Sequence, residues 1–310
     1  MQPFYLNFSI PELRPEISHS KGLAFLGSCF SDEIAAKAEY CGFQTNANPF
    51  GTVFHPLALA RFLSDCFYEN TTERLDAING RFISWDASSK FSEEARWGLL
   101  TKLTAKRQAF KSFLGSSSHL FITFGTAWGY VLNEEGLLVA NCHKVPGNKF
   151  TKSLSESAEL VNVWTSLIAD LNRAFPNLTL VFTVSPVRHV RDGMVQNNQS
   201  KAVLLDAVRQ LCAKTNALYF PSYEIVVDEL RDYRFFKEDR VHPTNEAIEY
   251  VWNRFIAASC SSETKSNIEE IVAYRKLCGH ISIHADETVK EAKMREKLAS
   301  IRLKLPQFIG

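Results

Sequence analysis

The sequence predicts an α/β fold with a mostly parallel sheet, and three observations lead to this class. Short apolar runs typical of buried strands occur at 22–27, 120–125 and 178–184. Longer segments of helical periodicity alternate with these runs, as in βαβ units. Each run ends in a turn rich in glycine, serine or proline. Ligands of such sheets bind at the carboxyl ends of the strands, so these turns are the first candidates for a functional site.

Composition limits the domain organisation and the function classes. The 310 residues are 45% hydrophobic, which suits one large domain at 1–260 with an insertion at 57–115, followed by a helical appendage at 261–310. A formal net charge of +1 argues against nucleic acid as a partner. No stretch approaches the roughly 18 apolar residues of a membrane span, and the start shows no export signal. Seven cysteines without a C-x-x-C pair indicate a reducing, cytoplasmic location.

The first strand runs directly into a helix. Apolar residues 22–26 end at Gly27, and residues 31–33 (Ser-Asp-Glu) are typical of the first turn of a helix. The turn between them places Ser28 and Cys29 beside unpaired N–H groups at the positive end of that helix. This location favours a nucleophile, because the helix end is expected to lower the pKa of a thiol.

The middle of the chain begins with loop chemistry at 46–56, which contains asparagine, glycine and two prolines. Residues 57–114 have a mainly helical pattern and are interpreted as an insertion or a lid. The second buried strand, 120–128, is followed by a hairpin formed by 130–132 and 137–140. This hairpin delivers residues 141–146 into a loop.

The second half repeats the alternation of helix and strand. A helix is expected over 153–175, opened by a capping box of Ser153 and Glu156. A buried strand at 178–184, a helix at 202–211 and a short strand at 217–220 follow. The last core helix is predicted at 245–258. Beyond it, charged amphipathic helices could pack on the domain or pair two copies of the chain into a homodimer.

A short loop near 240 carries a second chemical signal. Asp239 precedes His242 by three residues, and Thr244 is placed to cap the following helix. A histidine that acts as a base needs such a carboxylate, because the partner fixes the proton on the far ring nitrogen and leaves the near one to accept from the nucleophile. A D-x-x-H-P loop before the last core helix, combined with a G-x-[S/C] turn after the first strand, indicates nucleophilic catalysis.

Several motifs together resemble the GSCFA family of bacterial proteins, a branch of the SGNH/GDSL hydrolase superfamily, over residues 20–260. They are Gly27-Ser28-Cys29-Phe30, Asn48-Pro49-Phe50-Gly51, Gly125-Thr126-Ala127-Trp128, Asn141-Cys142-His143-Lys144, Ser185-Pro186-Val187-Arg188-His189 and Asp239 with His242-Pro243. The resemblance implies a flavodoxin-like, three-layer α/β/α fold. It also implies an ester or acyl hydrolase type of site acting on a small or acylated substrate.

Within this resemblance, Asp239 and His242 match the base and its carboxylate. The nucleophile of the G-D-S pattern is its third residue, which here is Cys29, with Ser28 in the aspartate position. Because consecutive side chains at a strand end point to opposite sides, only one of the two can face His242. The register favours Cys29, while Ser28, Ser31 or the absence of any nucleophile remain alternatives.

Roles around the reacting group follow from the same blocks. Gly51 or Asn48 matches the second block of the superfamily, which donates to the oxyanion. The third block departs from G-x-N-D, because Gly125-Thr126 is followed by alanine and tryptophan, so Asn141 is a candidate replacement. Gly125 and Thr126 at the strand end are expected to contact the substrate. His143, Lys144, Arg188 and His189 could line a pocket for an acidic or polar group, and His55 is a weaker candidate.

These observations are compatible with three functions. The first is an esterase or acyl hydrolase with an acyl-enzyme intermediate. The second is an acyltransferase of the same fold, and the third is a noncatalytic binding module. We expect no cofactor and no metal, because Cys278, His280 and His284 lack the spacing of a zinc site.

Overall fold

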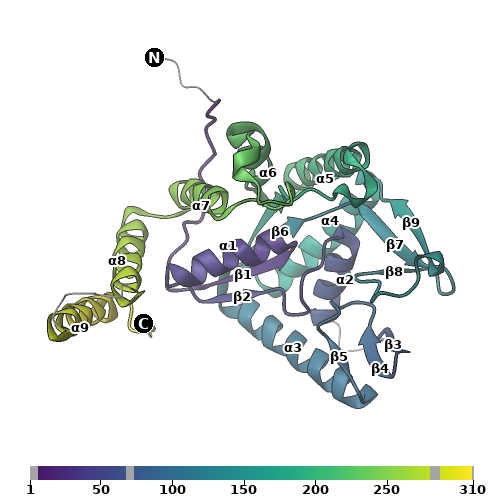
Figure 1. The fold of residues 1–310 in the computed structure, drawn as a ribbon, viewed down its shortest axis with the longest axis horizontal. Helices are drawn as coiled ribbons and strands as arrows, with labels where there is room; N and C mark the ends of the chain where they lie inside the picture. Colours follow the sequence, from purple (N-terminus) through teal and green to yellow (C-terminus); the bar gives the residue numbers. More distant parts are fainter. Residues whose placement is uncertain (1–5, 68–72, 280–286, 309–310) are drawn as a thin grey trace.

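A computed structural model describes residues 6–67, 73–279 and 287–308 of the chain. Its centre is a parallel sheet with the strand order β11-β10-β6-β1-β2 (Figure 1). Numbered along the sheet-forming strands alone, this order is 2-1-3-4-5, the flavodoxin-like arrangement. The strands are β1 (Gly22–Gly27), β2 (Thr45–Ala47), β6 (Ser117–Phe124), β10 (Thr179–Val184) and β11 (Leu218–Tyr219).

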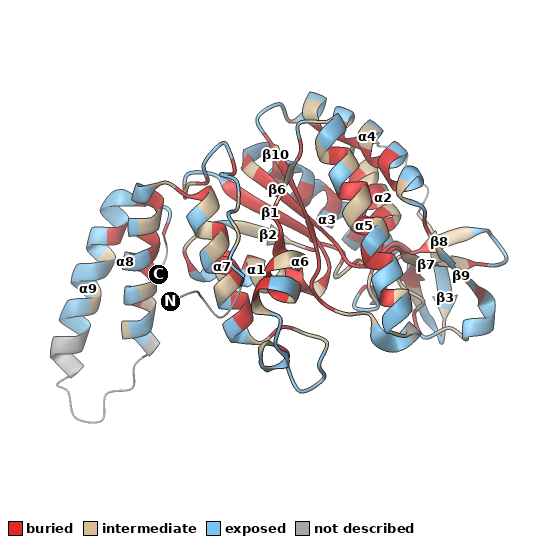
Figure 2. Cartoon of the chain, turned by 90° about the horizontal axis from the view of Figure 1, so that it is seen from above, coloured by how far each residue is buried: buried red, intermediate tan, exposed pale blue. Residues whose placement is uncertain are grey.

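Helices cover both faces of the sheet and give the predicted α/β class three layers (Figures 1 and 2). One face packs against α2 (Pro56–Phe67), α3 (Arg96–Ser116), α4 (Ser157–Ala174) and α5 (Met194–Lys214). The other face packs against α1 (Cys29–Tyr40) and α7 (Asn245–Ser259). The strands are buried on both faces, which is why they read as continuous apolar runs in the sequence.

The central strand β6 shows how the sequence divides between the two cores. Leu120, Ile122 and Phe124 contribute to the core beneath α4 and α5. Phe121 points the opposite way and packs against Phe255 of α7, with ring centroids 5.3 Å apart. This alternation is the two-residue period of a strand, and it fixes the register of β6 between its neighbours.

The edge strand β2 was not predicted from the sequence. Residues 46–56 are predicted as loop throughout, but Thr45–Ala47 pairs in parallel with Leu23, Ala24 and Phe25 of β1. The strand ends at Ala47 and is followed by Asn48, whose φ of 41° lies in the left-handed region that asparagine tolerates better than most residues. Three residues are too few to give a periodic signal, so only the tertiary pairing reveals this strand.

The segment 57–115 also differs from the expected helical insertion or lid. Its helices α2 and α3 are the crossover from β2 to β6 and pack within the main core. Between them lies a small antiparallel sheet of β3 (Leu75–Ile78), β4 (Arg81–Ser84) and β5 (Ser92–Glu93). The addition to the core is therefore this three-stranded sheet, since the helices themselves form the layer beneath β1 and β6.

The predicted hairpin gains a third strand. β7 (Trp128–Leu132) pairs with β8 (Leu137–Val139) on one side and with β9 (Phe150–Leu154) on the other. A 3₁₀ turn at Gly147–Lys149 leads into β9. The predicted capping box is therefore wrong, because Ser153 lies in β9 and the helix begins only at Ser157 with Glu156 before it.

The described segments after β11 lie outside the sheet. After β11 come α6 (Ser222–Glu224), a π-helical turn (Ile225–Leu230) and a 3₁₀ turn (Tyr233–Phe235). The last helices, α8 (Ser262–Gly279) and α9 (Glu287–Lys304), project from the body as a hairpin (Figure 2). Their shared apolar cluster contains Ile271, Tyr274, Ile301 and Leu305. Among the helices of the described ranges, none is both long and apolar enough to cross a lipid bilayer.

Candidate active site

The turn after β1 leaves one of the two candidate nucleophiles partly exposed and buries the other. Gly27 has a φ of +132°, and a Cβ there would lie 2.0 Å from the carbonyl oxygen of Thr123, so glycine is required at this bend. Ser28 follows at the N-cap of α1, where it is fully buried. Its Oγ has no hydrogen-bond partner within the described chain. Cys29, the first residue of α1, is half-buried and lines a cavity of about 870 Å³.

The same cavity is lined by His242, which Asp239 orients. Oδ2 of Asp239 lies 2.7 Å from Nδ1 of His242, so Nδ1 donates to the carboxylate and Nε2 is left to accept. Oδ1 accepts from the backbone N–H groups of His242 and Val241, at 3.0 and 2.9 Å. These backbone bonds hold the pKa of Asp239 far below its usual range, with the side-chain bond to His242 adding to the effect. Asp239 is therefore an ionised anchor for the imidazole.

The loop that carries this pair is closed at its base. The N–H of Lys237 donates to the carbonyl of His242 at 2.7 Å, and the N–H of Thr244 donates to Phe235 at 2.8 Å. Thr244 then caps α7 through its hydroxyl, which accepts from the N–H of Ala247 at 3.2 Å. The predicted D-x-x-H loop is thus held by hydrogen bonds between residues close in sequence. Its capping threonine joins the loop to the first turn of α7.

The thiol itself is less acidic than the helix end alone predicts. Burial raises the pKa of Cys29, and the nearby carboxylate of Asp32 raises it further. The N–H groups of Cys29 and Phe30, which have no partner inside a helix's first turn, act in the opposite direction. The expectation of a lowered thiol pKa is therefore wrong in direction, because burial outweighs the helix end. Ionisation of the Cys29 thiol therefore needs a base that accepts its proton or a cation that stabilises the thiolate.

Asn48 and Gly51 lie away from the Cys29 cavity and line a separate hollow with Asp32. The side chain of Asn48 accepts from the N–H of Gly27 at 2.8 Å and donates to Asp32 at 2.7 Å. The N–H of Gly51 donates to the carbonyl of Asn48 at 2.7 Å. The donors expected to hold an oxyanion are thus engaged in fastening the 48–51 turn to β1 and α1.

Asn141 lies at the wall of the Cys29 cavity, as expected for a replacement donor. Its Oδ1 accepts from the N–H of His143 at 2.8 Å, so the amide group of its side chain is the part left for other contacts. His143 lines the cavity too, but its Nε2 donates to the carbonyl of Ser84 at 2.8 Å and its ring packs edge-on against Trp85. Burial lowers the pKa of His143, so it is a neutral wall of the site.

The strand-end residues Gly125 and Thr126 use their backbone N–H groups within the fold. Both donate to the carbonyl of Phe54, at 2.9 and 3.1 Å, while Thr126 also lines the cavity. His55 is a core residue, since its Nε2 contacts the carbonyl of Ala127 at 3.2 Å and burial lowers its pKa to about 4. Phe54 and His55, from the predicted loop, therefore fasten the turn after β6.

Arg188 and His189 follow β10 and face the His242 loop. The guanidinium of Arg188 lies over the ring of Phe236 at 4.1 Å and donates to the carbonyl of Arg240 at 3.2 Å. The ring of His189 meets Phe54 edge-on, with centroids 5.4 Å apart. Both residues line the cavity. Arg188 thus holds a fixed positive charge beside the loop that carries His242.

One functional candidate escapes sequence reasoning. Lys201, on α5, is 2% exposed and donates to the carbonyls of Gly125 and Ser185, each at 2.7 Å. In the sequence it is one polar residue in an amphipathic helix, and nothing local marks it as buried. Its position becomes visible only when the ends of β6 and β10 are brought together.

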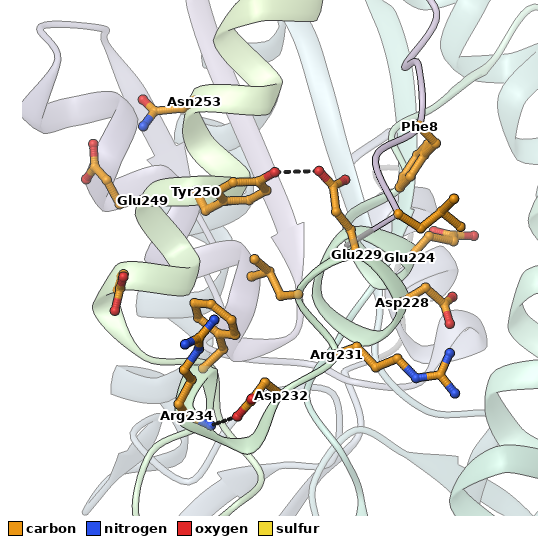
Figure 3. Close-up of a pocket in the computed structure, with 14 residues that line it drawn as sticks. Phe8, Glu224, Asp228, Glu229, Arg231, Asp232, Arg234, Glu249, Tyr250 and Asn253 are labelled. Atoms are coloured by element: carbon orange, nitrogen blue, oxygen red, sulfur yellow. Dashed lines mark hydrogen bonds between the residues drawn. The ribbon is translucent and has the colours of Figure 1, made fainter. Parts of the chain in front are cut away.

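A second, larger cavity of about 1150 Å³ lies apart from these residues, between the N-terminal strip, the 224–235 segment and α7. Six acidic side chains and two arginines line it (Figure 3). Glu229 is buried there, accepting from the Tyr250 hydroxyl and pairing with Arg254 at 2.8 Å. None of the predicted site residues lines this cavity.

A metal site needs several ligating side chains gathered around one point. Across residues 6–67, 73–279 and 287–308, no three His, Cys, Asp or Glu side chains gather where they could bind one ion. His280 and His284, considered above with Cys278, lie outside the described residues. The described site therefore offers a thiol, an imidazole and cationic side chains as its chemical groups.

The chain is similar to one described family and to several solved structures. A family model described as the GSCFA family matches residues 22–255. No curated protein matches the chain. A solved esterase, EstA from Pseudoalteromonas sp., is 12% identical, with 77% of this chain and 96% of that chain covered and a TM-score of 0.35.

Two further solved structures are similar to the same degree. A family two carbohydrate esterase from Clostridium thermocellum is 12% identical, with coverage of 85% and 67% and a TM-score of 0.40. A protein described as a GDSL-like lipase from Parabacteroides merdae is 14% identical, with coverage of 78% and 97% and a TM-score of 0.37. At these values the likenesses carry no argument about activity.

Proposed function

The chain belongs to the GSCFA family, and we propose that it is an ester or acyl hydrolase that forms an acyl enzyme on Cys29. The observation that carries the proposal is that Cys29 and His242 line one cavity, with His242 held by Asp239 at 2.7 Å. A nucleophile, a base and an orienting carboxylate are the groups that acyl transfer needs. The resemblance to SGNH/GDSL hydrolases supports the same reaction class.

In the proposed reaction, Nε2 of His242 takes the proton of the Cys29 thiol as Sγ attacks the carbonyl carbon of the ester. The tetrahedral oxyanion is stabilised by the N–H groups of Cys29 and Phe30 and by the side-chain amide of Asn141. The alkoxide then leaves with the proton from His242, and a thioester remains on Sγ. Water, deprotonated by His242, attacks this thioester, and the acid leaves as the thiol is restored.

The charge of the cavity supports an anionic substrate. Lys144, Arg188 and Arg191 line it, and none of the lining residues in the described chain is Asp or Glu. Phe54, Trp128 and other aromatic rings supply the apolar part of the wall. A p-nitrophenyl hemiester with a free carboxylate is therefore expected to react faster than its neutral methyl ester. The advantage should shrink as salt is added, and equal rates at low salt would contradict it.

Hydrolysis of short p-nitrophenyl esters by three variants tests the reaction. Cys29→Ala and His242→Ala are each expected to lose at least about 10²-fold in kcat/KM, since both take part in every turnover. Ser28→Ala is the matched control, because Ser28 is fully buried and its Oγ does not line the cavity. Full activity of His242→Ala, or loss of activity only in Ser28→Ala, would overturn the assignment.

Acyl transfer is the alternative that one observation favours. A cavity of about 870 Å³ lies in the upper part of the usual range for ligand sites and has room for an acceptor beside the acyl group. An acyltransferase would consume an acyl-CoA only when an acceptor is present and would hydrolyse it slowly. If Cys29 reacts with neither iodoacetamide nor esters at pH 7, the site is a noncatalytic binding pocket.

Two other expectations remain predictions. A cytoplasmic location follows from composition alone. A homodimer through α8 and α9 is to be tested by sedimentation of the full chain, and a monomer at all concentrations would overturn it.

A further inference from the structure

Three exposed apolar side chains lie where the loop after β10 leads into α5. Val190, Met194 and Val195 are 42%, 45% and 65% exposed. Single exposed apolar residues are ordinary, but several in one place mark a contact surface. We call these three residues the α5 rim.

The α5 rim is continuous with the wall of the cavity that holds the proposed nucleophile. Val190 is itself one of the residues that line this cavity. The indole N–H of Trp128, another lining residue, donates to the carbonyl of Gln196 at 3.0 Å. The N–H of His189, also in the wall, donates to Oδ1 of Asn197 at 2.9 Å. The first turn of α5 is therefore attached directly to the cavity wall.

The backbone bends sharply between the two parts of the rim. Gly193 has a φ of +101°, a conformation that residues with a Cβ rarely adopt. Its N–H donates to the carbonyl of Val190 at 3.0 Å, which closes the turn. Because α5 begins at the next residue, Met194, the 190–192 turn and the helix start are joined without a spacer. The bend thus keeps the apolar side chains of both segments at one edge of the cavity.

The start of α5 departs from the usual composition of a helix start. Helices favour Ser, Thr, Asp or Asn as the cap and carboxylates in the first turn. Before α5 stands glycine, without a side-chain cap, and the first turn has no acidic residue and opens with methionine and valine. Such departures from local preference are expected where a sequence serves a function. Methionine in particular suits a surface that adapts to a flexible ligand.

The ligand that reaches this surface can be inferred from its place. In the part of the chain that the structure describes, no segment covers the α5 rim, since all three side chains are exposed. The α8–α9 hairpin, where two copies of the chain are predicted to pair, projects from the end of the molecule remote from α5 (Figures 1 and 2). The acyl group of a substrate must enter the cavity at Cys29, whose wall also contains the apolar residues Phe54, Val187 and Val241. A chain longer than the cavity has to leave it over the edge.

We propose that the α5 rim is an acyl-chain subsite, over which the chain of a medium-length acyl ester passes as it leaves the cavity. The inference rests on the proposed acyl enzyme, because that step holds the carbonyl carbon on Sγ of Cys29 and directs the remaining chain away from it. Each methylene moved from water into apolar contact favours binding by up to about fourfold. The cationic wall residues Lys144 and Arg188 do not belong to the rim, so a substrate can place an anionic group on them and a chain on the rim.

The kinetic test compares p-nitrophenyl acetate, hexanoate and decanoate. Met194→Gln combined with Val195→Gln replaces two apolar side chains by amides at exposed positions, where the fold does not depend on them. We expect the ratio of kcat/KM for decanoate to kcat/KM for acetate to fall by at least about tenfold, chiefly through KM. Val163→Gln, at an exposed apolar position on α4 outside the cavity wall, is the matched control and should keep the wild-type ratio. A wild-type ratio in the double variant overturns the subsite.

A binding measurement on the wild-type chain needs no turnover. The chain has three methionines, so labelling with ¹³C-methyl methionine gives few NMR signals, and that of Met194 is identified by its loss in Met194→Leu. Decanoate below its micellar concentration should shift the Met194 signal saturably and slow the alkylation of Cys29 by iodoacetamide. Met294, which packs on the cluster between α8 and α9, is the internal control and should not shift. No shift of Met194, or equal shifts of both signals from nonspecific adsorption, overturns the subsite.

The subsite and the proposed hydrolase can fail separately. A chain that turns over no ester, yet binds decanoate at Met194 and protects Cys29, retains the subsite and rejects the hydrolase. Hydrolysis that depends on Cys29, with the same preference for chain length in the wild type and the double variant, retains the hydrolase and rejects the subsite.

Discussion

At the scale of single residues, Oδ2 of Asp239 holds the His242 imidazole in a single tautomer, while Oδ1 accepts from two backbone N–H groups of the same loop. Asp239→Asn replaces an acceptor by an amide whose N–H₂ can face Nδ1 and favour the wrong tautomer. We expect kcat/KM to fall by roughly 10²–10⁴-fold, with little change in thermal stability, because Asp239 is exposed. Ester hydrolysis and thermal unfolding are measured side by side.

Asp232→Asn is the control for this change. Asp232 lies seven positions earlier in the same connection and caps the turn at Tyr233–Phe235 without touching His242. It should keep wild-type activity. Equal losses in both variants would mean that general charge in this connection, rather than the Asp239 contact, sets the rate.

Substitution of Asn48 tests whether this asparagine has a structural or a catalytic role. Asn48→Ala leaves the N–H of Gly27 and one oxygen of Asp32 without their partner, both at buried or half-buried positions. We expect a loss of about 1–3 kcal/mol in the free energy of unfolding, measured by denaturant titration. Asn177→Ala, at an exposed position after α4, should change little. If Asn48→Ala instead lowers kcat at unchanged stability, Asn48 donates to the oxyanion after all.

At the scale of elements, a buried ion pair joins α3 to the segment that leads into β3. Arg107 on α3 is 6% exposed and pairs bidentately with Glu73, whose side chain is also buried. Removing one partner of such a pair leaves an uncompensated charge, so Arg107→Ala should cost about 3–5 kcal/mol in the free energy of unfolding.

Arg173→Ala on α4 is the matched control for Arg107. Its ion pair with Asp170 is exposed at the arginine and spans one turn of the helix. A change within about 0.5 kcal/mol is expected there. Similar costs for the two substitutions would contradict the view that the α3 pair docks this helix to the core.

Elements that carry their own local signal could be predicted from the sequence. β1, β6 and β10 are apolar runs stopped by glycine or serine, and the D-x-x-H loop with its threonine cap is contained within six residues. β2 and β9 could not be predicted. β2 has only three residues, too few to show a period, and β9 directly follows a polar turn, so the sequence does not mark where it begins. The false capping box at Ser153 arose because its residues fit a helix start locally, while pairing with β7 claims them for β9.

At the scale of the whole molecule, two buried histidines make stability depend on pH. Burial lowers the pKa of His55 and of His119 to about 4. In the unfolded chain they titrate near about 6.5, so below this pH the unfolded state binds protons that the folded state refuses. The free energy of unfolding therefore falls as pH drops from about 6.5 towards 4, by about 2 kcal/mol per histidine at pH 5.

His119→Gln tests this share away from the candidate site. Denaturant unfolding at pH 7 and pH 5 should show a smaller loss for the variant than for the wild type, by about 2 kcal/mol. Equal losses would mean that His119 is not held neutral in the folded chain.

The site as a whole could be predicted only in part. Cys29, His242 and Asp239 follow from short motifs, and the structure brings Cys29 and His242 to one cavity. The sequence suggested Gly51 and Asn48 as oxyanion donors, because it does not show that their polar groups already form hydrogen bonds within the fold. Lys201 was missed for the converse reason, since burial of a lysine depends on β6, β10 and α5 meeting at one edge.

Formation of a covalent acyl group on Cys29 is the most direct test of the account. The wild-type chain is mixed with p-nitrophenyl acetate, quenched in acid within the first turnovers, and mapped by peptide mass spectrometry. We predict one acetyl group on the peptide at Cys29 and its absence from Cys29→Ala. An acetyl group on Ser28, or a label that persists in Cys29→Ala, would contradict the assignment of the nucleophile.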